Sequence, residues 1–202
     1  MRIKELGRWT RRLAEHERRR AVSLALWAAR RRHGVGDGDT AFGYARAQAP
    51  ASYGLIFVCA VDTVAAPFML AAYPVAHLVM LVVDLYLLLV TLGLHAAAVT
   101  RPHVVGAGGV RVRRGAGFDL RIPLELIASV RHGARFPDAN TQQEGVLDLA
   151  VASQTSVTLE LVRPVTAVDL WGRRRQVRTV HWHADAAREA AAAVRALLPV
   201  GT

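Results

Sequence analysis

An almost uninterrupted apolar block at residues 54–99 limits the folds open to this chain more than any other feature. Between residues 51 and 100 the only charged side chains are Asp62 and Asp84, and Tyr73-Pro74 divides the block near its middle. The hydrocarbon core of a bilayer takes about 20 helical residues, so the block has room for two spans and is too long for one. Proline ends a helix and favours a tight connection. The sequence therefore predicts a transmembrane helical hairpin with spans at about residues 54–72 and 75–98.

Basic residues lie entirely outside this block. The chain carries 26 Lys and Arg residues against 16 Asp and Glu residues, a formal net charge of +10, and every basic residue falls within residues 1–50 or 101–202. Basic flanks on both sides of a hairpin place both termini in the cytoplasm by the positive-inside rule. The Arg- and Ala-rich, lysine-poor composition favours a bacterial source, so we expect the bacterial cytoplasmic membrane. Segregation of charge in this way argues against a nucleic-acid partner.

The first 50 residues form a basic segment that precedes the hairpin. Residues 6–33 are predicted to form a helix, with apolar side chains near one side at Leu6, Trp9, Leu13, Leu24 and Trp27. Such a helix either lies on the membrane surface or against the rest of the protein, or it is a partly ordered cytoplasmic tail. Residues 34–39, GVGDGD, form a linker. We therefore expect three parts, at residues 1–50, 51–100 and 101–202.

Residues 101–202 change to the period-two alternation of β-strands. A hairpin is predicted around the GAG turn of GVRVRRGAGFDLRIP, followed by short strands at LIASVRH, GVLDLAV, SVTLELV and QVRTVHWH. A helix over residues 185–198 follows, with Asp185 as its N-cap. These elements indicate an α+β membrane protein whose antiparallel sheet or barrel is capped by a C-terminal helix.

Two stretches of this β region carry a resemblance to a known family. RPHVVGAGGVRVRRGAGFDLRIPLELIASVR resembles the opening strands of membrane-tethered bacterial pleckstrin-homology-like domains, and VTLELVRPVTAVDLWGRRRQVRTVHWHAD resembles their last strands. Paired helices flanked by GDTAFGY and RPH are similar to those of small bacterial two-span proteins of this kind, so the resemblance covers residues 38–198. It implies a pleckstrin-homology-like fold and, since such proteins are mostly of unassigned function, no specific activity.

Polar residues inside the predicted spans form a polar stripe. With the turn at Tyr73-Pro74, Asp62 and Asp84 both lie near the bilayer midplane. In the second span the stripe consists of His77, Asp84, Thr91 and His95. It is expected to face a stripe in the first span made of Ser52, Cys59, Asp62, Thr63 and Ala66. Three interpretations remain open: helix contacts within a hairpin or homo-oligomer, a proton or cation relay, and docking against a polar residue of another membrane subunit.

Seven arginines form a predicted basic patch: Arg173, Arg174, Arg175 and Arg178 around one turn, and Arg111, Arg113 and Arg114 near the GAG turn. In a domain held close to an anionic leaflet, each such residue contributes about 1 kcal/mol to surface binding. Contact with lipid headgroups, a solvated basic turn and binding to an acidic partner are the three interpretations.

Metal and catalytic motifs are not expected. His181 and His183 share one face of a strand, but no third or fourth ligand accompanies them beyond a possible His132, so no metal or cofactor is predicted. The sequence contains no nucleophile elbow, phosphate-binding loop or dinucleotide fingerprint, and no small-molecule substrate is indicated. We expect a non-enzymatic adaptor or scaffold that binds a protein partner or anionic membrane lipids, as a homo-oligomer or with a membrane-protein partner. The alternative is a small subunit of a transporter or proton-linked complex that uses Asp62 and Asp84.

Overall fold

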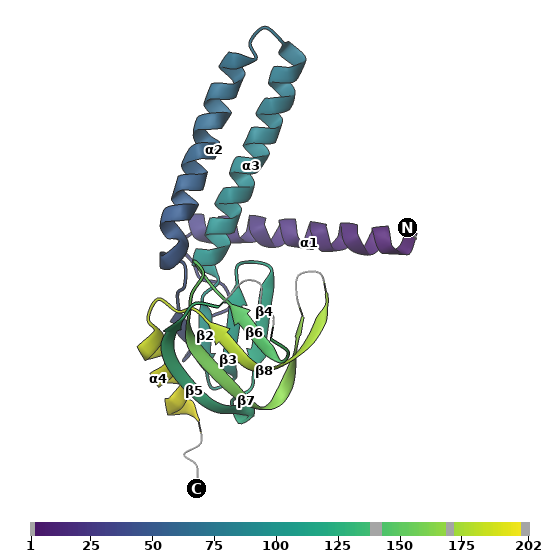
Figure 1. Cartoon of the computed structure of the whole chain (residues 1–202). Helices are drawn as coiled ribbons and strands as arrows, with labels where there is room; N and C mark the ends of the chain where they lie inside the picture. The colour runs from purple at the N-terminus through teal and green to yellow at the C-terminus, as the bar shows by residue number, and fades with distance from the viewer. Residues whose placement is uncertain (1–2, 138–142, 169–171, 199–202) are drawn as a thin grey trace.

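The computed structural model describes residues 3–137, 143–168 and 172–198, and it shows three parts stacked on one another (Figure 1). A hairpin of two long helices stands at one end and a β domain lies at the other. A third long helix crosses between them (Figure 1). The described chain is an α+β protein with four α-helices and two β-sheets. The sequence predicts the α+β class and these helices, but it predicts one antiparallel sheet or barrel where the structure has two sheets.

The hairpin consists of α2 (Ala49–Met69) and α3 (Pro74–Thr100), joined by a short turn that ends at Tyr73. Pro74 is the first residue of α3, where its fixed φ suits the helix and its missing N–H needs no partner. Both helices are long and apolar enough to cross a bilayer, and their apolar windows are 0% and 6% buried inside the chain. They are therefore not buried in the core of the described chain. The predicted pair of long apolar helices is confirmed, with α2 starting earlier than expected.

The helix α1 (Ile3–Ala28) runs across the base of the hairpin and packs on α3 (Figure 1). α1 passes over Gly93 of α3 at a distance that an added Cβ would fill with ordinary van der Waals contacts. A Cβ atom at Gly93 would lie 3.4 Å from the Cβ of Arg20 and 3.7 Å from the Cδ1 of Leu24. The helix is shorter at its C-terminal end than the predicted range of 6–33. The side chains of Leu6, Trp9 and Leu13 lie outside the described residues.

The β domain contains two four-stranded sheets. The first has the order β1-β2-β3-β4, with β1 (Thr40–Phe42), β2 (His103–Gly106), β3 (Gly109–Arg114) and β4 (Phe118–Ile122). The second has the order β5-β7-β8-β6, with β5 (Ile127–Arg135), β6 (Val146–Leu149), β7 (Thr155–Val168) and β8 (Arg174–Trp182). Alternate side chains of both sheets and the apolar face of α4 (Ala187–Leu197) enclose one core, with fully buried Val110, Val112, Ile122, Leu159, Trp182, Ala190 and Val194.

Strand pairing differs from the sequence prediction in two places. β6 pairs with β8 in parallel, so the expectation of a purely antiparallel sheet is wrong at this pair. The reason is strand order: β8 returns along β7, and β6 then adds to the far side of β8 instead of pairing with its neighbour in sequence. In addition, β1 pairs with β2 although it comes from the segment before the hairpin. The β domain therefore includes residues outside 101–202.

Asp185 has a different role from the predicted N-cap of the last helix. The residue at the start of α4 is Ala186, and it makes no side-chain capping bond. Asp185 instead turns towards the hairpin: its backbone N–H donates to the carbonyl of Gly43 (2.8 Å), and its carboxylate accepts from the N–H of Arg46 (3.4 Å). Asp185 therefore links the segment before α4 to the segment between β1 and α2, and it does not cap a helix.

The hairpin is joined to its surroundings by buried polar contacts at the end of α3. Arg101 is buried and donates from Nε to the hydroxyl of Ser23 on α1 (3.0 Å). One residue earlier, the carbonyl of Thr100 accepts from the N–H of His33 (2.8 Å). Burial lowers the pKa of Arg101, yet the group keeps hydrogen-bond partners that suit a cation. These contacts join the end of α3 to α1 and to the segment at His33, and the carbonyl of His33 in turn accepts from Arg113 of β3 (2.7 Å).

Candidate functional site

The three arginines near the GAG turn, which the sequence placed in one basic patch, lie in three different environments. Arg111 forms a two-pronged ion pair with Asp119 across β3 and β4, at 2.7 and 2.6 Å. Arg113 is 1% exposed and donates to the carbonyls of His33 (2.7 Å) and Gly34 (3.2 Å). Assigning Arg113 to a surface patch is therefore wrong, because the segment at His33 covers that face of β3. Arg114 remains exposed and has no hydrogen bond or ion pair among the described residues.

The second group of arginines lies at the start of β8. Arg173, Arg174, Arg175 and Arg178 are all exposed, and Arg178 donates to the carbonyl of Val162 (3.4 Å). The end of β7 and the beginning of β8 extend towards the side of the β domain that carries α1 and the hairpin (Figure 1). Positive charge from β8 is thus directed to the same side as the basic helix α1.

The predicted stripe of α3 lies on the packed side of the helix. Asp84 and His95 are 3% and 4% exposed, while His77 and Thr91 are half-buried. His77 is bonded through Nδ1 to the carbonyl of Pro67 (3.2 Å), and Thr91 donates to carbonyls of its own helix. His95 packs against the rings of Trp27 and Tyr53, at centroid distances of 5.8 and 4.8 Å. Asp84 differs from the others because its buried Oδ2 has no hydrogen-bond partner among the described residues.

The two aspartates of the hairpin do not share an environment within one chain. Asp62 is exposed on α2, whereas Asp84 is buried. The other predicted members of the α2 stripe, Ser52, Cys59, Thr63 and Ala66, are half-buried on the packed side. The described residues include no contact between the two carboxyl groups, so an approach between hairpins of different chains stays a prediction.

His181 and His183 do not face a common site. His181 is buried under Arg135, which bonds to its Nε2, and its Nδ1 bonds to the hydroxyl of Thr158 (2.8 Å). His183 follows the end of β8 and lies 3.8 Å from Asp185. Burial lowers the pKa of both histidines. His132 is exposed and approaches Arg195 instead, and no cluster of three or more metal-ligating side chains occurs in the described part of the chain.

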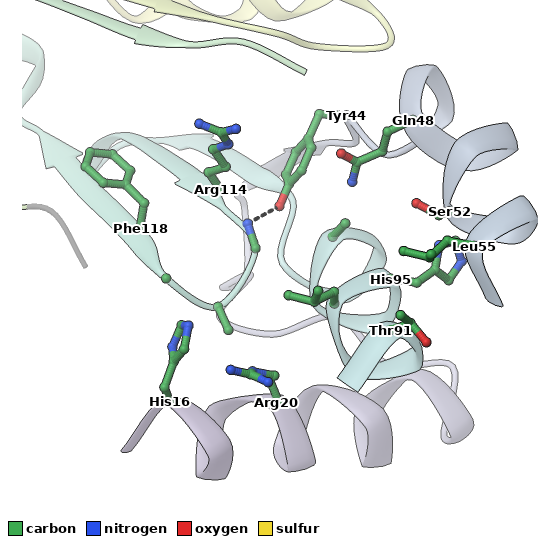
Figure 2. Close-up of a pocket in the computed structure, with 15 residues that line it drawn as sticks. His16, Arg20, Tyr44, Gln48, Ser52, Leu55, Thr91, His95, Arg114 and Phe118 are labelled. Atoms are coloured by element: carbon green, nitrogen blue, oxygen red, sulfur yellow. Dashed lines mark hydrogen bonds between the residues drawn. The ribbon is translucent and has the colours of Figure 1, made fainter. Parts of the chain in front are cut away.

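A cavity of about 510 Å³ lies where α1, α2, α3 and the β3–β4 turn meet, and we name it the junction cavity (Figure 2). In Figure 2 His16 and Arg20 reach it from α1, Thr91 and His95 come from α3, and Ser52 from α2. Further lining residues are Tyr44, Gln48, Leu55, Leu94, Ala98, Arg114, Gly115, Ala116, Gly117 and Phe118. The cavity combines the guanidinium of Arg20 and the imidazole of His16, both from α1, with apolar walls from the hairpin.

Arg20 is the more buried of the two arginines that line this cavity, since Arg114 is exposed. Its stem packs on Gly93, its Nη1 lies 3.3 Å from the carboxylate of Glu17, and its side chain is 16% exposed. Its Nε is buried without a hydrogen-bond partner among the described residues. His16 lies one helical turn earlier on the same face. Burial and the charge of Arg20 lower the pKa of His16.

The opposite wall of the cavity is fixed by Tyr44. This side chain is 1% exposed, and its hydroxyl accepts a hydrogen bond from the N–H of Gly115 (2.7 Å) in the β3–β4 turn (Figure 2). Burial raises the pKa of Tyr44 to about 12, so the phenol keeps its proton at neutral pH. The hydrogen bond and the burial together hold the Gly115–Gly117 turn against the hairpin base.

Behind Tyr44 lies a buried histidine that sequence reasoning missed. His103 lies between the rings of Tyr44 and Trp182, at centroid distances of 4.7 and 4.5 Å. Its Nδ1 accepts from the N–H of Arg113 (3.1 Å), and its Nε2 donates to the carbonyl of His183 (2.9 Å). Burial lowers the pKa of His103 to about 3, so the imidazole is neutral and has both nitrogens satisfied. A single histidine at the start of a short strand carries no sequence signal for this role.

Comparison of the chain with protein-family models, curated protein sequences and solved structures finds no match.

Proposed function

We propose that this chain is a two-span protein of the bacterial cytoplasmic membrane, with both termini in the cytoplasm. Its pleckstrin-homology-like β domain acts as a non-enzymatic adaptor that binds another protein or the anionic membrane surface. One observation carries this proposal: an exposed apolar hairpin is joined through buried polar contacts to a β domain with a closed core.

Support for membrane insertion comes from the side chains of the hairpin. Val58 and Val82 are each 61% exposed, and most of the exposed large hydrophobic side chains belong to α2 and α3. An apolar surface of this extent marks contact with a membrane or another protein. Helices satisfy their own backbone hydrogen bonds, which is the requirement for crossing hydrocarbon.

The depth of α1 follows from the length of α3. Gly93, where α1 crosses, is nineteen residues beyond Pro74, which corresponds to about 29 Å along a helix. This length matches the hydrocarbon thickness of about 30 Å, so α1 lies at headgroup level when the hairpin spans the bilayer. A basic helix at that level is attracted to anionic lipid.

Support for an adaptor comes from the β domain. Two four-stranded sheets closed by a C-terminal helix are the elements of a pleckstrin-homology-like fold. The buried polar groups nearest its core, His103 and Arg113, bond to backbone groups of the same chain. Exposed arginines of β8 lie on the side of α1, where a headgroup or an acidic partner would meet them.

Photo-crosslinking in native membranes tests the adaptor. A photoreactive residue at Arg175 on β8 is compared with one at Arg188 on α4, since both side chains are exposed and lie on different elements. Mass spectrometry is expected to find a discrete protein or lipid adduct at Arg175 and much less at Arg188. Equal, diffuse labelling at both positions would contradict the proposal.

A second candidate function rests on Asp84. A buried carboxyl group with an unpaired oxygen inside an apolar hairpin is the kind of group that proton-coupled membrane complexes use. In that case Asp84→Leu would assemble normally and abolish proton-coupled transport in vesicles, whereas Asp62→Leu would leave it unchanged. An adaptor keeps its partner adducts in both variants.

A further inference from the structure

The geometry points to the junction cavity as a binding site for the phosphate group of an anionic phospholipid, held by Arg20 and His16 with the acyl chains against the hairpin. This inference rests on the proposed insertion of the hairpin. It adds a specific ligand at a site made by α1 and α3, away from the arginines of β8.

The first argument is the state of the arginines. Arg101 and Arg113 are also largely buried, but each guanidinium donates to at least two oxygen atoms of its own chain, including those of Ser23 and His33. The buried Nε of Arg113 also lacks a hydrogen bond, but it lies 3.6 Å from the carboxylate of Asp119. Arg20 instead has one partial ion-pair partner, Glu17, and a buried Nε that lacks an acceptor. Buried donors without acceptors are costly, so an acceptor supplied by a ligand would complete the site.

Second, a guanidinium and an imidazole lie together on one face of α1. His16 and Arg20 are one helical turn apart and both project from α1 towards the β3–β4 turn in Figure 2. The guanidinium of Arg114 points away from them in this view, so it is not part of the site. The turn opposite Arg20 consists of Gly115, Ala116 and Gly117, whose small side chains leave room for a phosphate-sized group. A guanidinium fork fits a phosphate with two oxygens available to it.

The third argument distinguishes a lipid from a soluble anion. Leu55 and Leu94 line the cavity and are each 52% exposed on the outer surface of the hairpin, so the cavity is continuous with the surface that lipid would cover. Arg20 packs on Gly93, about 29 Å along α3 from the turn, whereas Leu55 is fourteen residues before the end of α2 at Met69, or about 21 Å from the turn. With the hairpin inserted, the Arg20 end of the cavity therefore lies at phosphate depth and the Leu55 end lies nearer to the acyl chains. A free phosphate would leave the apolar wall unused.

The test uses the full chain, first floated with vesicles and then delipidated in mild detergent. Native mass spectrometry follows the binding of dioleoyl-phosphatidylglycerol and dioleoyl-phosphatidylcholine, with and without excess inorganic phosphate. The expected result is one phosphatidylglycerol per chain, bound at least about tenfold more tightly than phosphatidylcholine and resistant to inorganic phosphate. About tenfold is the effect of one charge-assisted hydrogen bond.

Matched variants separate this site from general basic attraction. Arg20→Gln with His16→Gln is expected to lose the selectivity at least about tenfold, while Arg20→Lys retains part of it. The control replaces Arg30, Arg31 and Arg32 with glutamine. These exposed arginines line a different cavity beside Trp27, so the control removes more charge and leaves the site intact. It is expected to change the selectivity less than about threefold.

Three outcomes would overturn the inference. They are equal affinity for the two lipids, full displacement of phosphatidylglycerol by inorganic phosphate, and a loss in the Arg30–Arg32 variant as large as in the cavity variant. Failure of the wild-type chain to float with vesicles would instead refute membrane insertion, and with it the proposed function. A thermal unfolding curve for each variant confirms that α1 still packs on α3.

Discussion

The hairpin and the β domain use the same apolar residues in opposite ways. In the β domain Val110 and Val112 are fully buried, because alternate positions of each strand face one shared core. In the hairpin Val58 and Val82 are 61% exposed, because consecutive apolar residues cover all sides of a helix. The β domain encloses its apolar side chains within its own chain, whereas the hairpin leaves most of its apolar side chains exposed.

Two buried polar side chains, one in each region, differ in their hydrogen bonding. His103 in the β domain has both ring nitrogens bonded inside the chain. Asp84 in the hairpin is equally buried, yet its Oδ2 has no partner among the described residues. Hydrogen bonding is not complete throughout the β domain, because the Nε1 of Trp182 and the Nδ1 of His183 also lack partners among the described residues. The clear difference between the two regions is therefore in their apolar side chains, which the β domain buries and the hairpin exposes. Each prediction below tests this difference.

The largest expected change in the free energy of unfolding is at an aromatic side chain of the β domain, and an aromatic side chain of the hairpin serves as its comparison. Trp182→Ala empties the centre of the β-domain core and should lower the free energy of unfolding by about 3–5 kcal/mol. Phe57→Ala, on a hairpin residue that is 68% exposed, should lower it by less than about 0.5 kcal/mol. Chemical denaturation of the chain in detergent, followed by near-ultraviolet circular dichroism, measures both. Similar losses would show that the hairpin surface is packed against protein.

The second expected change in the free energy of unfolding separates two neighbouring arginines, Arg113 and Arg114. Arg113→Met leaves the carbonyls of His33 and Gly34 without their donor inside the junction, so we expect a loss of about 3 kcal/mol. Arg114→Met changes an exposed side chain without described bonds and should be within about 0.5 kcal/mol of the wild type. The same denaturation experiment distinguishes them. Equal effects would contradict the separation of these residues into a structural and a surface arginine.

The third effect is acid sensitivity of the β domain through His103. Its pKa is about 3 in the folded chain and about 6.5 when unfolded, so between these values the unfolded state binds more protons and stability falls as pH falls. The slope is at most about 1.4 kcal/mol per pH unit, or about 2 kcal/mol between pH 7 and pH 5. Unfolding curves at both pH values should show a smaller difference for His103→Gln than for the wild type. An unchanged difference would mean that His103 does not titrate on unfolding.

The smallest effect concerns Asp84. Because its carboxyl group is buried with an unpaired oxygen, Asp84→Leu should leave the thermal stability of the reconstituted hairpin unchanged or raise it by about 1 kcal/mol. Asp84→Asn serves as the control that keeps the size of the side chain. A loss of stability in both variants would reveal a partner for Asp84 in another chain.

Much of this architecture follows from local sequence patterns. The long apolar block with Tyr73-Pro74 predicts two helices and their turn, and alternation around the GAG turn predicts β3 and β4. Strand order is not local, so the parallel pairing of β6 with β8 could not be predicted from the separate strands. Helical spacing alone also placed Asp62 with the packed residues of α2, although it lies at the edge of that face and is exposed.

The candidate site was predictable only in part. Arg113 is buried because residues about eighty positions earlier, His33 and Gly34, cover the outer face of β3. Nothing in the alternation of GVRVRR separates it from Arg114. The junction cavity needs four elements to meet, so Arg20 carried no signal within the basic run of α1. The sequence indicated that the segment containing α1 is basic, but tertiary packing decides which of the arginines are available to a ligand.

The central claim is that the hairpin crosses a membrane and holds the β domain on one side of it. Single-cysteine labelling in intact bacterial cells tests this directly, starting from Cys59→Ala, which removes the one native thiol. Tyr73→Cys marks the hairpin turn, and Gly133→Cys marks the β domain at a position where an added Cβ meets no atom within 4 Å. We expect a membrane-impermeant maleimide to label Tyr73→Cys in intact cells and Gly133→Cys only after permeabilisation. Labelling of both positions from the same side would contradict the account.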